Sequence, residues 1–415
     1  MPDTLLIRAG HLMDGTGAPP QKDVDVLIRD GRIVSVSPRS GAPPRDAEVV
    51  DAPDGTLTPG LVDAHLHLAY SGPNPAWNAV KDKPDLLLSW ASRNCRLALA
   101  AGLTTAGDCG APRTAGLRLR EALRLGLFPG PRVQVCDQPI STTCGHTYDI
   151  SLYADNADEL RKAVRYLCQQ RVDFIKVMAT GGSMDPETNR RRASYTVEEL
   201  RAVVEEAHRL YKRVVAHVNG TEGIRNAVWA GVDQLAHCNW LGAADGSIVY
   251  DEEVAAQAAR QGMWVDFNIN AGINPLATGD GKSEDWSRWE KPPRTRWDLV
   301  NRMRLMGAPV LLSSDAVGAN YDRLITTLPK LVAAYPEVRP EEALHMATLA
   351  PARCMGMEAE TGSVMPGKWA DLLLVRGDAT DGLKTLPDLQ RVYLKGREMV
   401  RHEAGRVWVC GETVG

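Results

Sequence analysis

Several features are scarce or missing in this 415-residue chain. It has no apolar stretch long enough to span a membrane, so no transmembrane helix is expected. It has no basic run with interleaved aromatic residues, and its net charge of −4 argues against a nucleic-acid partner. The first thirteen residues lack the long apolar core of a signal peptide. We therefore expect a cytoplasmic protein that binds neither nucleic acid nor membrane.

Paired cysteine motifs are also missing. The eight cysteines are scattered, and none forms a Cys-x-x-Cys pair. This spacing is typical of free thiols in a reducing compartment. Cys109, Cys136 and Cys238 fall at the ends of predicted strands, where a buried thiol is the expected role and a place facing a site is the alternative.

The composition is that of an ordinary globular protein, with 44% hydrophobic and 24% charged residues. Its length suggests one domain of barrel size and a smaller one. Near the N-terminus, Asp30-Gly31 separates two alternating runs and predicts a hairpin. Strand patterns return after residue 362. We predict that residues 1–57 and 360–415 form one small β-sandwich domain, split in sequence by residues 58–359.

The intervening segment alternates strand-like runs with helical periods. Such alternation predicts an α/β fold, here a (β/α)8 TIM barrel. A capping box, Thr196 with Glu199, opens a helix over 197–211. A long loop is expected between residues 137 and 173, and a final helix over 340–354. The eight predicted strands cover 61–65, 104–108, 132–137, 173–179, 214–217, 234–237, 264–268 and 309–315.

Metal-ligating residue types gather at the ends of these strands. His65 and His67 are two residues apart on a strand, so they point to the same side. A pair of core or surface histidines is the simpler alternative. Barrel enzymes place their chemistry at the carboxyl ends of the strands, and imidazole and carboxylate suit zinc. The residues at these ends are His65, His67, Lys176, His217, His237 and Asp315.

Lys176 is unusual because a lysine within a buried strand loses hydration. It either extends its amine to solvent, pairs with a carboxylate, or reacts with carbon dioxide to form a carbamate that bridges two metals. The residues alone leave these alternatives open.

At this point the chain resembles the amidohydrolase superfamily over nearly its whole length. The motifs are PGLVDAHLH at 59–67, IKV at 175–177, AH at 216–217, AHC at 236–238 and SSD at 313–315. The resemblance implies two divalent metal ions, expected to be zinc. His65, His67, Lys176 and Asp315 would hold one, and Lys176, His217 and His237 the other, with Lys176 as a carbamate. It also implies the split β domain.

Within the superfamily, the segments KVMATGG at 176–182 and HVNGTEGI at 217–224 are similar to those of cytoplasmic Xaa-Pro dipeptidases and aryl-urea or carbamate hydrolases. Deaminases of the superfamily usually lack the lysine. The dipeptidases are expected to carry a tyrosine where this chain has Asn219, which weakens the prediction of a dipeptidase. His146 lies in a loop that commonly faces the substrate.

Two other groups could reach a substrate. The insertion 268–297 holds Trp286, Trp289 and Trp297, which could line an apolar pocket, anchor the loop or form a subunit interface. Tyr195 and the arginines at 190–192 could contact an anion.

We therefore expect a metal-dependent hydrolase that cleaves a C–N bond of a small molecule with a metal-bridging hydroxide. Asp315 would carry the proton, and His146 or Asn219 would polarise the carbonyl. The alternatives are an Xaa-Pro dipeptidase or N-acyl amino-acid hydrolase, and a deaminase or a hydrolase of lactones, cyclic amides or phosphotriesters. A non-catalytic scaffold would lack a ligand, and none is missing. A homo-oligomer is expected.

Overall fold

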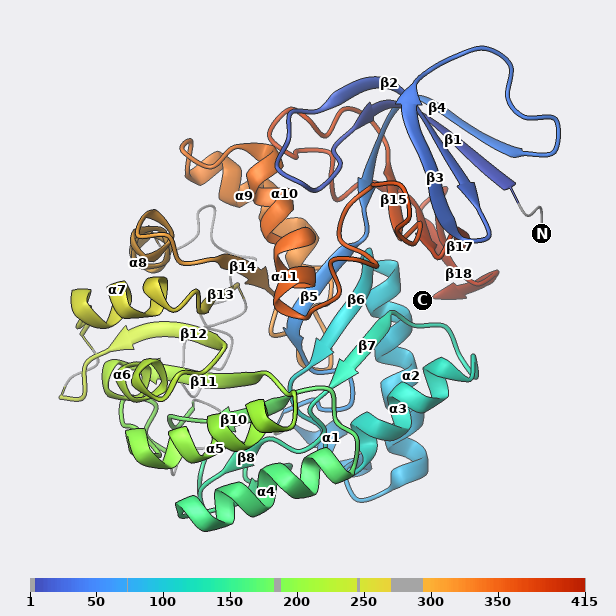
Figure 1. The fold of residues 1–415 in the computed structure, drawn as a ribbon. Coiled ribbons are helices and arrows are strands. Elements are labelled where there is room, and N and C mark those ends of the chain that lie inside the picture. The colour runs from blue at the N-terminus through green and yellow to red at the C-terminus, as the bar shows by residue number, and fades with distance from the viewer. Residues whose placement is uncertain (1–3, 73, 183–187, 245–246, 270–293, 415) are drawn as a thin grey trace.

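The computed structural model describes residues 4–72, 74–182, 188–244, 247–269 and 294–414. The two ends of the chain meet in one nine-stranded sheet, with the order β19-β18-β17-β16-β15-β4-β1-β2-β3. Thr58 of β4 pairs antiparallel with Leu373 of β15, so the predicted association of the two ends is confirmed. Figure 1 shows these N- and C-terminal strands side by side at one end of the molecule. The strands are β1 (Thr4–Leu12), β2 (Gln21–Arg29), β3 (Arg32–Pro38), β4 (Glu48–Pro59), β15 (Leu372–Val375), β16 (Leu389–Leu394), β17 (Arg397–Glu403), β18 (Arg406–Val409) and β19 (Glu412–Val414).

The predicted hairpin between β2 and β3 is confirmed. Arg29 pairs with Arg32, which leaves Asp30 and Gly31 as a two-residue turn. Both have positive φ, 51° and 75°, as the favoured two-residue hairpin turn requires.

Parallel strands form the rest of the sheet structure, in a three-stranded sheet ordered β5-β6-β7 and a seven-stranded sheet ordered β14-β13-β12-β11-β10-β8-β9. Each of the eight predicted strands overlaps one of them. They are β5 (Leu61–Leu66), β6 (Leu103–Asp108), β7 (Arg132–Val135), β8 (Ile140–Ser141), β9 (Leu152–Tyr153), β10 (Ile175–Met178), β11 (Val214–Gly220), β12 (Gln234–Leu241), β13 (Trp264–Asn268) and β14 (Val310–Ser313).

The two parallel sheets meet at both edges. Asp315, just after β14, donates its backbone N–H to the carbonyl of His65 on β5 at 2.8 Å. Asp173, just before β10, donates to the carbonyl of Val135 on β7 at 2.8 Å. The strands therefore follow one another around a ring, although strand ladders among the described residues do not close it into a single barrel sheet.

Helices cover the outside of this ring (Figure 1). The capping box at Thr196 is present, and α5 begins at the next residue. The helices are α1 (Pro75–Val80), α2 (Pro84–Ala100), α3 (Ala115–Arg124), α4 (Ala157–Gln169), α5 (Val197–Arg209), α6 (Thr221–Ala230), α7 (Glu252–Arg260), α8 (Arg294–Leu305), α9 (Arg323–Ala334), α10 (Pro340–Met346) and α11 (Leu349–Cys354).

Two helix predictions were wrong. The segment predicted as a long loop contains α4, which Asn156 caps by accepting from the Glu159 N–H. Its buried residues Leu160, Ala163 and Val164 have the spacing of one helix face, so the signal was present in the sequence. The single helix predicted over 340–354 is two helices, because Thr348 leaves the helical conformation between α10 and α11.

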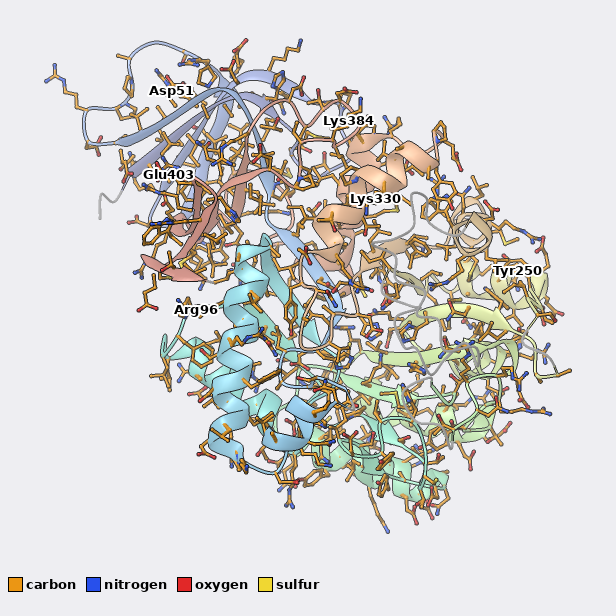
Figure 2. The ribbon with its side chains drawn as sticks, turned by 180° about the vertical axis from the view of Figure 1, so that it is seen from behind. Asp51, Arg96, Tyr250, Lys330, Lys384 and Glu403 are labelled. Atoms are coloured by element: carbon orange, nitrogen blue, oxygen red, sulfur yellow. The ribbon has the colours of Figure 1, made fainter. Side chains whose placement is uncertain are left out.

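The sheet of the chain ends also contacts the outer helices. Arg96 of α2 pairs with Glu412 of β19 at 2.9 Å, and Figure 2 shows Arg96 beside that sheet from behind. Inside the ring, Cys109, Cys136 and Phe174 belong to one small apolar cluster. Burial raises the pKa of the Cys109 thiol to about 12, so this cysteine is a protonated core residue, as predicted. Among the described residues, no helix has both the length and the apolar character to cross a bilayer.

Candidate metal centre

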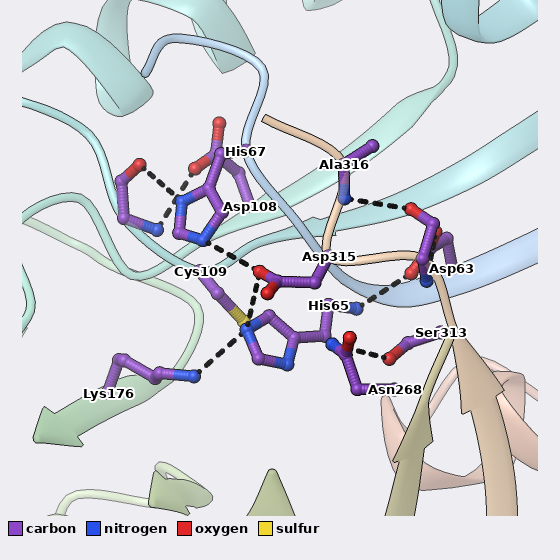
Figure 3. Close-up of polar contacts among 12 residues, drawn as sticks. Asp63, His65, His67, Asp108, Cys109, Lys176, Asn268, Ser313, Asp315 and Ala316 are labelled. Carbon is purple, nitrogen blue, oxygen red and sulfur yellow. Dashed lines mark hydrogen bonds and ion pairs between the residues drawn. The ribbon is translucent and has the colours of Figure 1, made fainter. Parts of the chain in front are cut away.

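His65 and His67 project together from the carboxyl end of β5, beside Asp315, which follows β14. The Asp315 Oδ1 atom lies 3.5 Å from His65 Nε2 and 3.4 Å from His67 Nε2. One ligand atom from each of the three residues lies within 4.8 Å of the other two (Figure 3). The predicted proximity of these residues is confirmed, and their spacing suits one metal ion.

Hydrogen bonds at the other ring nitrogen, Nδ1, orient both histidines. The Nδ1 atom of His65 lies 3.0 Å from Asp266 Oδ2, and that of His67 lies 3.0 Å from the Gly110 carbonyl oxygen. Such acceptors fix the proton on Nδ1 and leave the Nε2 lone pair for a metal. Asp266 also accepts from Gln234 Nε2 at 3.2 Å and from the Ser313 hydroxyl.

Asp266 was not predicted from the sequence, although an acidic residue in the middle of the apolar β13 was a signal. Asp63 holds the backbone of the same region with its side chain. Its carboxylate accepts from the His65 and Ser314 N–H groups, each at 3.0 Å, and so joins the two strands that carry the ligands.

Lys176 lies beside the same histidine. Its Nζ atom is 3.2 Å from His65 Nε2, and the residue is only 1% exposed. Burial, and then the charge of Lys176 among other causes, holds the pKa of His65 well below its usual value. Burial is also the largest cause of the lowered pKa of His217 and His237, and the charge of Lys176 is among the smaller causes for both. One buried amine therefore faces both groups of histidines, as the sequence predicted.

His217 and His237 form the second group. Their ring centroids are 4.5 Å apart, and those of His237 and His65 are 5.2 Å apart. The Nε2 atom of His217 lies 3.3 Å from the Gly181 carbonyl oxygen. The structure thus brings all six predicted ligands into one buried region.

The other predicted site residues surround His217. The ring of His146 is 4.6 Å from that of His217 and packs against Gly182, where a Cβ atom would come within 2.1 Å of it. The Asn219 side-chain nitrogen is 2.8 Å from His217 Nε2, and its oxygen accepts from Asn239 at 2.6 Å. Asn219 therefore contacts a predicted ligand. Asn239 was not predicted from the sequence.

The protonation states suit a cation. Burial lowers the pKa of His65, His217 and His237, so these imidazoles are neutral and can donate a lone pair. Burial alone would raise the pKa of Asp315, but the nearby His65 and His67 keep it below its usual value. Burial likewise opposes the shift at His67, where the hydrogen bond with Asp315 raises the pKa.

Backbone strain coincides with two of these residues. His237 has φ of 71° and Asp315 has φ of 48°, a left-handed conformation that is uncommon for residues other than glycine. Each such residue costs on the order of 1–3 kcal/mol and persists where the surroundings fix it, often at functional sites. The donor set of neutral imidazoles, a carboxylate and a buried amine fits divalent metal ions such as zinc.

Several other predicted contacts are not part of this region. Tyr195 is buried, and its hydroxyl donates to the Ala154 carbonyl at 2.8 Å. Trp297 is a core residue of α8, packed between Phe267 and Tyr335 with centroid distances of 5.4 Å to each. Trp286 and Trp289 lie outside the described residues.

A ring of parallel strands with histidines, an aspartate and a lysine at the strand ends defines a class of α/β hydrolases with metal centres. A model described as the Amidohydrolase family matches residues 56–399. The chain belongs to the Amidohydrolase family and is an enzyme of that family.

Similar proteins agree with this assignment. Ochratoxinase from Aspergillus niger is 25% identical over 421 residues, covering 93% of this chain and 84% of that protein. The structure of a Xaa-Pro dipeptidase with bound methionine has a TM-score of 0.82 at 23% identity, covering 95% of this chain and 99% of that one. Phenylurea hydrolase B has a TM-score of 0.77 at 19% identity, covering 95% and 96%. The shared fold is a TIM barrel with a second domain.

Proposed function

We propose that the protein is a metal-dependent hydrolase that cleaves a C–N bond in a small amide, carbamate, urea or peptide-like substrate. The observation that carries this proposal is the cluster of buried His65 and His67 with the half-buried Asp315, with Lys176 at 3.2 Å from His65 Nε2. The names of the similar proteins support the bond class, since they include a dipeptidase and a phenylurea hydrolase.

Two metal ions, zinc by donor type, fit the residues in two sets. His65, His67, Lys176 and Asp315 would hold one ion, and Lys176, His217 and His237 the other. When bound, the pair would lower the pKa of a shared water and polarise the scissile carbonyl group.

Lys176 would act in this centre as a carbamate. The neutral Nζ amine forms a bond to the carbon of carbon dioxide while one C=O π bond opens onto oxygen, and one N–H proton passes to solvent, which leaves an anionic carbamate; an ammonium group first loses one further proton. An unmodified ammonium group at 3.2 Å from a metal-facing His65 nitrogen would repel a cation, whereas the carbamate would bind it.

Asp315 would move the proton. Its carboxylate faces His65 and His67, and its lowered pKa keeps it ionised and able to accept a proton from the attacking water. It would then protonate the leaving nitrogen. His146 would polarise the carbonyl oxygen of the substrate. Asn219, which contacts His217 and Asn239, would assist by orienting His217 as well as by facing the substrate.

A second candidate, a dipeptidase or N-acyl amino-acid hydrolase, is favoured by one observation. Arg296 donates to the Asn268 carbonyl at 3.3 Å, at the end of the strand between those of His237 and Asp315. Burial is the largest cause of the lowered pKa of His237, followed by the charges of His65 and Lys176 and then by the charge of Arg296. A cation in this place would attract a substrate carboxylate.

The test is a hydrolysis screen of zinc-loaded protein with N-acyl amino acids, dipeptides and aryl ureas. We expect turnover of at least one class, abolished by chelation and by Asp315→Asn. Turnover that persists after complete removal of the metal would contradict the proposed mechanism.

Three other features are part of the proposal. The small β domain would comprise residues 1–57 and 360–415, and the hydrolase domain residues 58–359; the shared sheet of the two ends supports this division. A cytoplasmic location is supported by the eight free cysteines. Assembly into a homo-oligomer stays a prediction.

A further inference from the structure

A cavity of about 540 Å³ lies beside the candidate metal centre. Its walls come from α1, α2, the start of α3 and the loop that carries His146. These segments follow β5, β6 and β7, so the cavity is at the same end of the ring as the metal centre. Its volume is within the range of small-molecule sites, roughly 300–1,000 Å³.

Apolar side chains separate the cavity from the predicted ligands. The Tyr70 ring lies between His67 and Trp77, with centroid distances of 5.7 Å and 4.9 Å. Trp77 and Ile150 line the cavity, whereas Tyr70 and His67 do not. The cavity is therefore one aromatic side chain away from His67, and a molecule in it would not touch the metal ligands.

The wall is held in shape by internal hydrogen bonds. Trp77 Nε1 donates to Asp149 at 2.9 Å, and the Tyr153 hydroxyl donates to the Tyr148 carbonyl at 2.8 Å. Trp77 and Ile150 are almost fully buried, together with Leu87 and Ala91 of α2, and form the base of this wall, whereas the rings of Tyr148 and Tyr153 are exposed. A wall with exposed, hydrogen-bonded aromatic rings favours a flat, aromatic ligand.

Three basic side chains also line the cavity, those of Lys81, Arg113 and Arg118. Two acidic residues also line it. These are Asp82 and Asp149, so the three cations outnumber the carboxylates by one.

We propose that this cavity binds an aromatic carboxylate. The ring would lie against Tyr148 and Tyr153, whose exposed rings line the cavity, and the carboxylate would be held by Arg113 and Arg118, whose guanidinium groups can donate paired hydrogen bonds. This site goes beyond the proposed hydrolysis, since it uses none of the metal ligands and its occupation needs no turnover.

The probe is 2-naphthoate, titrated by isothermal calorimetry into the metal-loaded protein. We expect saturable binding of one molecule per chain at this site, and at least about tenfold weaker binding of the neutral 2-naphthamide, since the charge-assisted bonds are lost. The double variant Arg113→Gln with Arg118→Gln should weaken naphthoate by a similar factor. Arg260→Gln, which alters an exposed arginine of α7, is the matched control and should leave binding unchanged.

A second variant tests the cavity by shape. Ala115→Trp adds a large side chain at its wall and should abolish naphthoate binding while the melting temperature is retained. The proposal is overturned if naphthoate does not bind. It is also overturned if binding survives both the double arginine variant and Ala115→Trp, because the carboxylate is then held elsewhere, for example at the metals.

Discussion

Asp266 offers the sharpest test of how hydrogen bonds to the predicted ligands support the candidate metal centre. Its Oδ2 atom accepts from His65 Nδ1 at 3.0 Å and from Gln234 at 3.2 Å, and its Oδ1 atom accepts from Ser313. In Asp266→Asn, the amide oxygen can keep the first two bonds, and the amide nitrogen can donate to the Ser313 hydroxyl. The negative charge is lost, together with the acceptor of the Ser313 O–H.

The expected losses follow from this geometry. Asp266→Asn should weaken zinc binding by about tenfold, the lower end of the range for such hydrogen bonds to metal ligands and equal to about 1.4 kcal/mol. Asp266→Ala removes the acceptor of three buried donors, which are His65 Nδ1, Gln234 Nε2 and the Ser313 hydroxyl. It should weaken zinc binding by about a hundredfold and also destabilise the fold by about 1–3 kcal/mol for each group left unsatisfied.

The assay is competition for zinc with a chromophoric chelator, combined with thermal unfolding of the metal-free protein. Glu206→Gln is the matched control, because Glu206 is also buried and ion-paired, with Arg165, but lies on α5 and contacts none of the predicted ligands. It should change stability without changing zinc affinity. Equal zinc affinity in the wild type and Asp266→Ala would refute the reasoning.

Three further predictions concern the proposed reaction. Lys176→Ala should lose activity and regain part of it with metal and a short-chain carboxylate; an unmodified amine in the metal-loaded wild type, by ¹³C NMR with labelled bicarbonate, would rule out the carbamate. Asp315→Asn should lower kcat by about 10²–10⁴, typical of a general acid–base group, with further loss if metal is released; unchanged kcat at full metal content would assign the proton to another group. Because Asn219 offers only a neutral amide, neutral substrates should have the higher kcat/KM in matched pairs with and without a terminal carboxylate. A tenfold preference for the carboxylate, about 1.4 kcal/mol, would instead favour the candidate function that involves Arg296.

The metal-facing residues were predictable because strand geometry is regular. His65 and His67 share a side by the two-residue repeat of a strand, and parallel strands bring their carboxyl ends together. The same rules placed Lys176 and Asp315 beside them. The strand patterns at both ends of the chain predicted a shared β domain, whereas the pairing of β4 with β15 comes from the structure.

Contacts that depend on side-chain direction were not predictable in this way. Asp266 is two residues before the end of its strand, and only the packed structure shows that it meets His65. Asn219 was predicted to face the substrate, and its contacts with His217 and Asn239 became clear only from the structure. The buried place of Trp297 likewise depends on how α8 packs against Phe267.

The most direct test of the central claim is the metal content of active protein grown with ample zinc and bicarbonate, measured by elemental analysis alongside turnover. The two ligand sets that share Lys176 predict about two divalent ions per chain at full activity. One ion per chain in fully active protein would contradict the binuclear centre.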